Sequence, residues 1–489
     1  MPLDWTPVAL GTGSNPGRDT QAGDARFINC YAESSGQEGV ARFPVYACEG
    51  YELFKTLATS GTGAPRAMLA LSDSALYVVS GTRLVKLDAS ATETAITGTL
   101  TGSGLVTMAR NRKEPNAQIA IALANGASGQ LWFCENDTLT QFDLTTLATG
   151  NIVSVSSIDG YVIPYFENGE FFASDIDAST IDDLSFAKSE SSPDSGVISK
   201  VRGRELVLFG TSSTEWWQNT GATDFPFERV TSSGFGCYAA GSAVNVMHVG
   251  DGSVIDTIAF CATNDQGSYA GVCLLDGYNV RKISTPAIDR MVQAETDKTT
   301  IKAFSYAING HTFYTLSTSA ATASYDLSTG MWHERKSSGL GFWRLRTACS
   351  FGTKLIVGDY TSAKVYTMRT GLYSATASTL TLKHSNVFGD TWNATRTASI
   401  GGSSERGTQV VFNRLGQSRP DGKLFQISIS NALTEEGTGL DMTVQPPTVT
   451  AWPKRVRVYA ASVNVISGAS QADRPKGLLG FAIKQRTLD

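Results

Sequence analysis

The stretch Gly160–Ser174, GYVIPYFENGEFFAS, decides the fold class of this chain. Two apolar arms flank the pair Asn168-Gly169. An Asn-Gly pair between apolar runs is the strongest short signal for a β-hairpin, because both residues tolerate the positive φ that a tight two-residue turn requires. The stretch therefore predicts two antiparallel strands, and the same pattern can be followed along the chain in both directions.

Six further stretches repeat this design of an apolar strand, a turn rich in Gly, Asn, Asp or Ser, and a second strand. Together with the first hairpin they begin about 30–55 residues apart. The four-stranded blades of a β-propeller repeat at about 40–50 residues. The six stretches are Ala75–Asp88, Gln130–Asp143, Arg204–Gln218, Thr257–Ile283, Thr312–Arg335 and Lys354–Met368.

The repeated hairpins predict an all-β chain that contains a six- or seven-bladed β-propeller. A single blade leaves apolar surface uncovered, and packing blades around a common axis covers it while ring closure leaves only short strand edges. Both blade numbers remain open, because some of the hairpins could be half-blades. A two-sheet sandwich is the alternative architecture that the same pattern allows.

The regions on either side of the hairpins differ from them in composition. We expect an irregular N-terminal arm over 1–60 that packs on the propeller, the propeller itself over 61–370, and a C-terminal β-sandwich-like domain over 371–489. The clean alternation of KRVRVYAASVNV at Lys454–Val465 supports strands in the last region. Pro286–Glu295, with Pro at the first helical position, predicts a short helix.

Charge and composition argue against a nucleic-acid-binding protein. The 489 residues include 40 Lys and Arg against 45 Asp and Glu, a net charge of −5. Proteins that grip phosphates carry a basic surface. Charged residues make up 17% of the chain, below the roughly 25% of an average soluble protein, and the 48 glycines suit many tight turns.

Cysteine usage and the termini indicate where the chain is made. The seven cysteines are odd in number and form no CxxC pair, so we expect buried, reduced thiols and neither a zinc site nor a redox motif. The N-terminus lacks the basic and apolar regions of a signal peptide. No run of 18 apolar residues predicts a membrane span. Synthesis in a cytoplasm is therefore expected.

No motif points to an active site, and we expect no catalytic, cofactor-binding or metal-ligating residues. The four histidines lie far apart in sequence, and no nucleophile elbow, phosphate loop or HExxH motif is present. A group of aspartates resembles a calcium site only loosely, because it lacks the Gly and closing Glu of an EF-hand, and a solvated loop is expected there. These residues are Asp175, Asp177, Asp182 and Asp183.

Several blocks, taken in order, resemble one protein family: the tail hub or nozzle protein of short-tailed bacteriophages, also called tail accessory factor or packaged DNA stabilisation protein. The resemblance covers about residues 26–465. One departure is Cys48-Glu49-Gly50, where the family has Pro-Gly. The blocks are Arg26–Glu33 (RFINCYAE), Ile158–Asp194, Arg202–Gly221, Gly236–Ala240, Asp276–Asp289, Phe412–Leu415 and Lys423–Ile429.

The resemblance implies a structural, non-enzymatic virion protein of the phage tail that is made in the cytoplasm of the host bacterium. Such hubs form a homo-hexamer beneath the head-to-tail connector or adaptor ring, where they extend the DNA channel, retain packaged DNA and conduct it at ejection. The implied partners are the connector, the tail plug or needle, and the tail spikes or fibres. Genomic double-stranded DNA would pass through the lumen without specific binding.

An assembly subunit needs specific contacts of at least about 1,000 Å² per interface. Clustered aromatic residues in loops are candidates for the anchors of such contacts, and the alternative for each of them is a place in the blade core. The possible interface anchors are Trp216, Trp217, Phe225, Phe227, Phe342 and Trp343.

Two other functions remain open at this point. The first is a glycan-binding or glycan-cleaving β-propeller, which would gather carboxylates and aromatic side chains at one funnel of the ring. The second is a general propeller scaffold inside a cell, which would be a monomer that does not associate with particles.

Overall fold

The computed structural model shows an all-β chain whose described residues contain one α-helix, α1 (Pro286–Gln293), at the predicted position. No helix in the described part is long and apolar enough to span a bilayer. The structure describes residues 5–7, 13–17, 25–33, 45–147, 149–250, 253–369, 378–385, 391–398, 408–413, 424–435, 438–445, 455–466 and 478–488.

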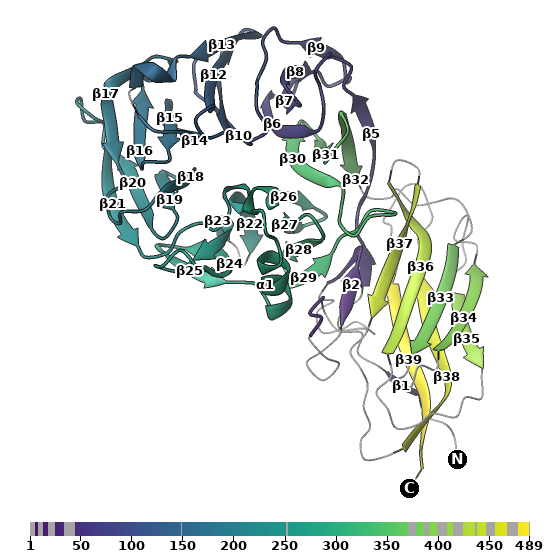
Figure 1. Ribbon diagram of the computed structural model, residues 1–489. Coiled ribbons are helices and arrows are strands. Elements are labelled where there is room, and N and C mark those ends of the chain that lie inside the picture. Colours follow the sequence, from purple (N-terminus) through teal and green to yellow (C-terminus); the bar gives the residue numbers. More distant parts are fainter. Residues whose placement is uncertain are drawn as a thin grey trace.

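Seven four-stranded antiparallel blades form a closed ring around a central axis (Figure 1). In the first six blades the strands follow one another in sequence, and the first strand of each blade lies nearest the axis. Blades 1–3 consist of β6 (Pro65–Ser72), β7 (Ala75–Ser80), β8 (Arg83–Leu87) and β9 (Glu93–Ala95); β10 (Leu105–Arg110), β11 (Ile119–Ala124), β12 (Gln130–Glu135) and β13 (Thr138–Phe142); and β14 (Ile152–Ile158), β15 (Tyr161–Phe166), β16 (Glu170–Ser174) and β17 (Ile181–Lys188). Blades 4–6 consist of β18 (Gly196–Arg202), β19 (Glu205–Gly210), β20 (Thr214–Asn219) and β21 (Phe227–Ser233); β22 (Val244–Gly250), β23 (Ser253–Thr263), β24 (Tyr269–Asp276) and β25 (Asn279–Lys282); and β26 (Lys302–Ile308), β27 (His311–Ser317), β28 (Thr322–Asp326) and β29 (Met331–Glu334).

The predicted hairpins coincide with paired strands of these blades. The turn between β12 and β13 consists of Asn136 and Asp137, whose φ angles are 49° and 59°. Two consecutive positive φ angles give the tight turn whose twist matches antiparallel strands, and Asn and Asp adopt it at low cost. Gly169, with φ of 85°, serves the turn between β15 and β16. Local turn chemistry therefore sets the hairpins.

Blade 7 joins the two ends of the ring. It consists of β30 (Leu345–Phe351), β31 (Lys354–Asp359), β32 (Lys364–Arg369) and, as its outermost strand, β5 (Gly50–Thr56). β5 pairs antiparallel with β32, so that Gly50 lies opposite Arg369. The region expected as an N-terminal arm thus supplies one strand of the ring itself, and this strand gives blade 7 the same four strands as the other blades. The blade number is seven.

Each pair of neighbouring blades shares its own apolar core, and these seven cores hold the ring together. The middle strands of a blade are covered on both faces by neighbouring blades, so their sequences are continuous runs of mostly apolar residues. In β7, for example, Leu76–Ser80 are all buried. This arrangement rules out the two-sheet sandwich for the hairpin region. The seven cysteines form no disulfide, and all except the half-buried Cys349 are buried.

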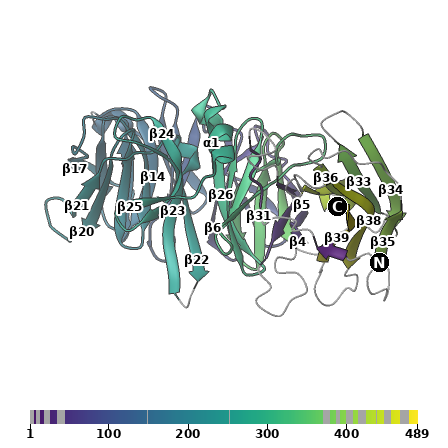
Figure 2. The same ribbon diagram turned by 90° about the horizontal axis from the view of Figure 1, so that it is seen from below.

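The C-terminal strands, together with β1, form two antiparallel sheets, which lie as two layers beside blades 6 and 7 in both views (Figures 1 and 2). One sheet has the order β1-β39-β38-β35, and the other contains β34, β33, β36 and β37. The bounds are β1 (Trp5–Pro7), β33 (Ser378–Ser385), β34 (Thr391–Ala398), β35 (Thr408–Asn413), β36 (Leu424–Glu435), β37 (Thr438–Gln445), β38 (Arg455–Ile466) and β39 (Leu478–Leu488).

Candidate functional site

The ring and the C-terminal strands are connected by one continuous sheet, and we call this connection the joint. β2 (Arg26–Ile28) lies between β29 of blade 6, which it pairs in parallel, and β37, which it pairs antiparallel. β36 pairs in parallel with β5 of blade 7, where Glu435 lies opposite Tyr51. The outer edges of both blades therefore continue into the C-terminal domain (Figure 1).

The N-terminal segment is fixed to blade 6 by its side chains as well as by its backbone. Arg26 forms a bidentate ion pair with Glu334, in which Nε lies 2.9 Å from Oε1 and Nη2 contacts Oε2. Asn29, with φ of 57°, donates its amide to the carbonyl of Lys336 at 3.1 Å and accepts the Lys336 backbone N–H at 2.9 Å. The Asn29 side chain thus forms two hydrogen bonds with the backbone of Lys336 at the point where the Asn29 backbone leaves the regular strand conformation.

A fully buried ion pair lies at the centre of the joint. Arg335 donates from Nη2 to the carbonyl oxygen of Glu49 at 3.0 Å, and its Nη1 lies 3.5 Å from Glu49 Oε2. The guanidinium also stacks on Trp343, 3.9 Å from the ring centre. Burial raises the pKa of the Glu49 carboxyl, although the charge of Arg335 opposes this. Glu49 belongs to the Cys-Glu-Gly stretch that departs from the family pattern.

Two histidines of blade 6 lie beside this pair, and their pKa values are shifted in opposite directions. His311 Nδ1 lies 2.7 Å from Asp326 Oδ2. Burial lowers the pKa of His311, but the hydrogen bond and charge of Asp326 outweigh it and place the pKa above its ordinary value. Burial and the nearby Arg335 lower the pKa of His333 to about 3. Tyr31, on β3 (Cys30–Ala32), packs edge-on against His311 at 5.0 Å.

The titratable groups of the joint are thus engaged in structure. Within the described residues, no group of three His, Cys, Asp or Glu side chains is placed to hold a metal ion. In the aspartate group that resembles a calcium site, Asp177 accepts the backbone N–H of Arg112 at 2.9 Å and Asp175 accepts the hydroxyl of Thr180. Both carboxylates organise a surface loop.

The structure places the expected interface anchors mostly inside the ring. Trp217 and Phe225 pack around Phe171 of blade 3, at 5.0 and 5.5 Å between ring centres. Four of the six aromatic residues are buried in the cores between blades, which is the alternative that the sequence left open for them. The buried ones are Trp216, Trp217, Phe227 and Trp343, and the half-buried ones are Phe225 and Phe342.

Exposed large apolar side chains occur in several blades, and three of them belong to blade 3, two on β17 and one in the loop that precedes it. Leu184 is 79% exposed, Ile176 59% and Phe186 44%. A signal for two of them was present in the sequence, since Leu184 and Phe186 alternate with Ser185 and Ala187 in β17. Successive side chains of a strand point to opposite faces, so Leu184 and Phe186 lie on the same face of β17, and both are exposed there. We call these three residues the blade 3 patch.

These features define a class: a seven-bladed β-propeller that is closed by an N-terminal strand and fused through a continuous sheet to a C-terminal β domain. A family model described as "Bacteriophage P22 Gp10, beta-propeller" matches residues 29–373, which include the whole ring. The chain belongs to this family of phage structural proteins.

Solved structures with a propeller fold show only a distant likeness. The WD40 β-propeller domain of Doa1 is 15% identical, with a TM-score of 0.41, and the match covers 66% of this chain and 98% of that chain. A chain of the mitotic checkpoint complex is 9% identical, with a TM-score of 0.40, over 69% and 95% of the two chains. The designed Ika8 protein is 8% identical, with a TM-score of 0.35, over 65% and 99%. No curated protein sequence matches the chain.

Proposed function

We propose that this phage structural protein is the hub, or nozzle, of a short tail, where a hexamer extends the DNA channel below the head-to-tail connector. The observation that supports the proposal is the family match over residues 29–373. In this role the hexamer retains packaged DNA, conducts it at ejection without specific binding, and carries the plug or needle and the spikes or fibres.

The joint suits such a subunit. A hub contacts several neighbours at once, so its parts must keep a fixed relation to one another. The continuous sheet attaches the C-terminal domain to blades 6 and 7 at two edges, and the buried Glu49–Arg335 pair links these two blades to each other. The ring and the domain therefore present two separate surfaces on one subunit, and simultaneous contacts with different partners require such surfaces.

The proposal is tested by the copy number of the chain in purified phage particles, measured by quantitative mass spectrometry against the connector and capsid proteins. A hexameric hub predicts about six copies per particle. Absence from particles would contradict the proposal. Robust release of reducing sugar from bacterial surface polysaccharide by the purified chain would also contradict it and would favour the glycan-processing alternative.

The blade 3 patch provides a test of assembly. Exposed apolar side chains that gather at one edge are candidates for a contact with a neighbouring protein. Leu184→Glu places a charge at the most exposed of the three and is expected to reduce incorporation into particles at least tenfold, while the fold is retained because the side chain lies in solvent.

Incorporation is measured by complementing a phage that lacks the gene and quantifying the chain in purified particles. Thr140→Glu is the matched control, because Thr140 is an exposed residue on β13, the outermost strand of the neighbouring blade 2. Equal incorporation of both variants would show that the blade 3 patch is not a contact surface of the hub. That outcome would not affect the copy-number test.

A further inference from the structure

The inner strands of the seven blades enclose a cavity of about 1030 Å³ at the axis of the ring. Its charged side chains are all cationic, and no Asp or Glu is among the described residues that line it. This is unexpected in a chain with five more acidic than basic residues. The cations come from five different blades: Arg66 on β6, Arg110 on β10, Lys200 on β18, Lys302 on β26 and Arg346 on β30.

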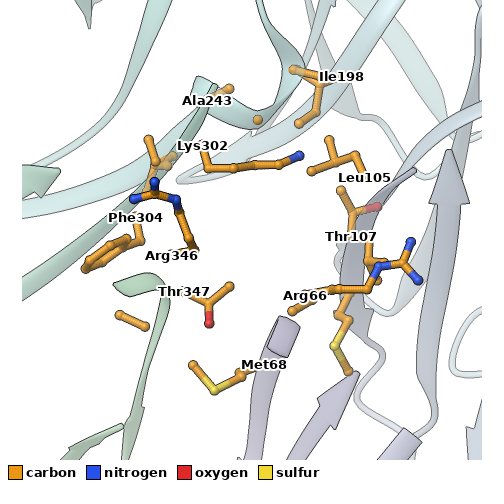
Figure 3. Close-up of a pocket in the computed structure, with 18 of the residues that line it drawn as sticks. Arg66, Met68, Leu105, Thr107, Ile198, Ala243, Lys302, Phe304, Arg346 and Thr347 are labelled. Carbon is orange, nitrogen blue, oxygen red and sulfur yellow. The ribbon is translucent and has the colours of Figure 1, made fainter. Parts of the chain in front are cut away.

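Three of the cations belong to the end of the cavity where the inner strands begin. Arg66, Lys302 and Arg346 are the second, first and second residues of their strands. Figure 3 shows the Lys302 side chain extended across the cavity, with the guanidinium groups of Arg346 and Arg66 to either side in this view. Three blades thus contribute positive charge to one space.

The two arginines are held in place by neutral acceptors. Arg66 donates to the carbonyl oxygens of Gly81, at 3.1 Å, and Gly104. Arg346 donates to the carbonyl oxygen of Trp343 at 2.7 Å and to that of Thr318 at 3.2 Å. Carbonyl groups orient a guanidinium without neutralising it. The two guanidinium groups are therefore preorganised, and neither forms an ion pair with a carboxylate in the described part of the chain. Burial lowers the pKa of Arg346 to about 10, and the nearby Tyr360 and Asp359 oppose this effect only in part.

The lysines have no ion-pair partner within the described part of the chain. Burial lowers the pKa of Lys302 and the charge of Arg66 lowers it further, while Asp297, outside the cavity, acts in the opposite direction. Burial lowers the pKa of Lys200 to about 8, against a smaller effect of Cys237. Like charges are thus crowded in a partly desolvated space, and binding an anion would relieve their repulsion.

We propose that the central cavity binds a small ligand with several phosphate charges, held by Arg66, Lys302 and Arg346. Arginine and lysine are the side chains that recognise phosphate oxygens in proteins. The volume is that of a small-molecule pocket, which takes one compact ligand. Apolar side chains of the inner strands, including Met68, Leu105 and Ile198, complete the walls.

The phosphate groups could belong to an inorganic oligophosphate or to a nucleotide, and both present the same oxygens to the cations. A nucleotide would also place its base against the apolar wall. The site goes beyond the proposed function and is independent of it, because the cavity lies within one ring and requires no assembled particle.

The test is isothermal titration calorimetry of the purified full-length chain at 150 mM salt and pH 7, with sodium tripolyphosphate and, separately, with ATP in the absence of metal ions. One ligand per chain is expected. Tighter binding of ATP would identify a nucleotide as the ligand class, and equal binding would identify the oligophosphate group alone.

The decisive variant is Lys302→Gln, because the Lys302 amine forms no hydrogen bond or ion pair with the described residues, so that its loss leaves the fold intact. Binding of both probes is expected to weaken at least tenfold. Lys188→Gln, which removes the same charge from the exposed outer edge of blade 3, is the control and should leave binding unchanged. Absence of binding to the unmodified chain, or equal weakening by both variants, would overturn the proposal.

Discussion

Replacing Glu49 with alanine is expected to lower the free energy of unfolding by about 3 kcal/mol, because breaking a buried ion pair leaves an uncompensated charge inside the protein. This value lies at the lower end of the range for breaking a buried ion pair, because Arg335 keeps its hydrogen bond to the carbonyl oxygen of residue 49 and its stacking on Trp343. The measurement is the shift of the denaturation midpoint, together with hydrogen exchange of the amides of β5 and β29.

The same strand offers a matched control in Glu52, which forms an exposed ion pair with Arg369 at 2.8 Å. Exposed pairs contribute about 0–1 kcal/mol, so Glu52→Ala should change stability little. The double variant Glu49→Met with Arg335→Met should recover part of the loss, because apolar side chains of similar size can replace a buried pair. Equal destabilisation by Glu49→Ala and Glu52→Ala would contradict the role given to the buried pair.

Acidification is expected to destabilise the joint through His333, by roughly 5 kcal/mol in total between about pH 6.5 and pH 3. The folded-state pKa of about 3 lies below the ordinary value, so the unfolded chain binds more protons in this window and stability falls as the pH falls. His311 has the opposite shift, and the stability that it contributes is present below its ordinary pKa and lost as the pH rises.

The acid effect is measured as the denaturation midpoint at a series of pH values for the unmodified chain and for His333→Gln, which carries no titratable ring. The variant should show a shallower fall of stability between pH 6.5 and 4. His248→Gln, on β22 in blade 5, removes a histidine outside the joint and should retain the slope of the unmodified chain. Identical slopes for all three proteins would exclude His333 as the source.

Local chemistry explains which parts of the fold could be predicted from the sequence. The pairs Asn136-Asp137 and Asn168-Gly169 specify turns whatever surrounds them, and Pro286 begins a helix for the same local reason. The repeat of such hairpins sufficed for a propeller with six or seven blades. To establish that the ring has seven blades, one must know that β5 pairs with β32, which lies more than 300 residues further along the chain. No local sequence pattern shows such a pairing.

The surfaces were harder to predict than the fold, because burial depends on what packs against a strand. Trp216 and Trp217 were candidates for exposed anchors, yet they lie on opposite faces of β20, and each face is covered by a neighbouring blade. The most exposed of the large apolar side chains is Leu184, which is not aromatic. The Arg66–Lys302–Arg346 site was not visible either, since its residues are spread over 280 positions and meet only when the ring closes.

The closure of blade 7 by β5 also sets the order in which the protein can be completed during translation. β5 is among the first strands to leave the ribosome, and its partner β32 is among the last of the ring. At roughly 5–20 residues per second, β5 waits about 15–60 seconds for that partner. Until then the six complete blades form an open arc with two unpaired ends, so a nascent chain depends on chaperones or on rapid synthesis to avoid joining the arc of another chain.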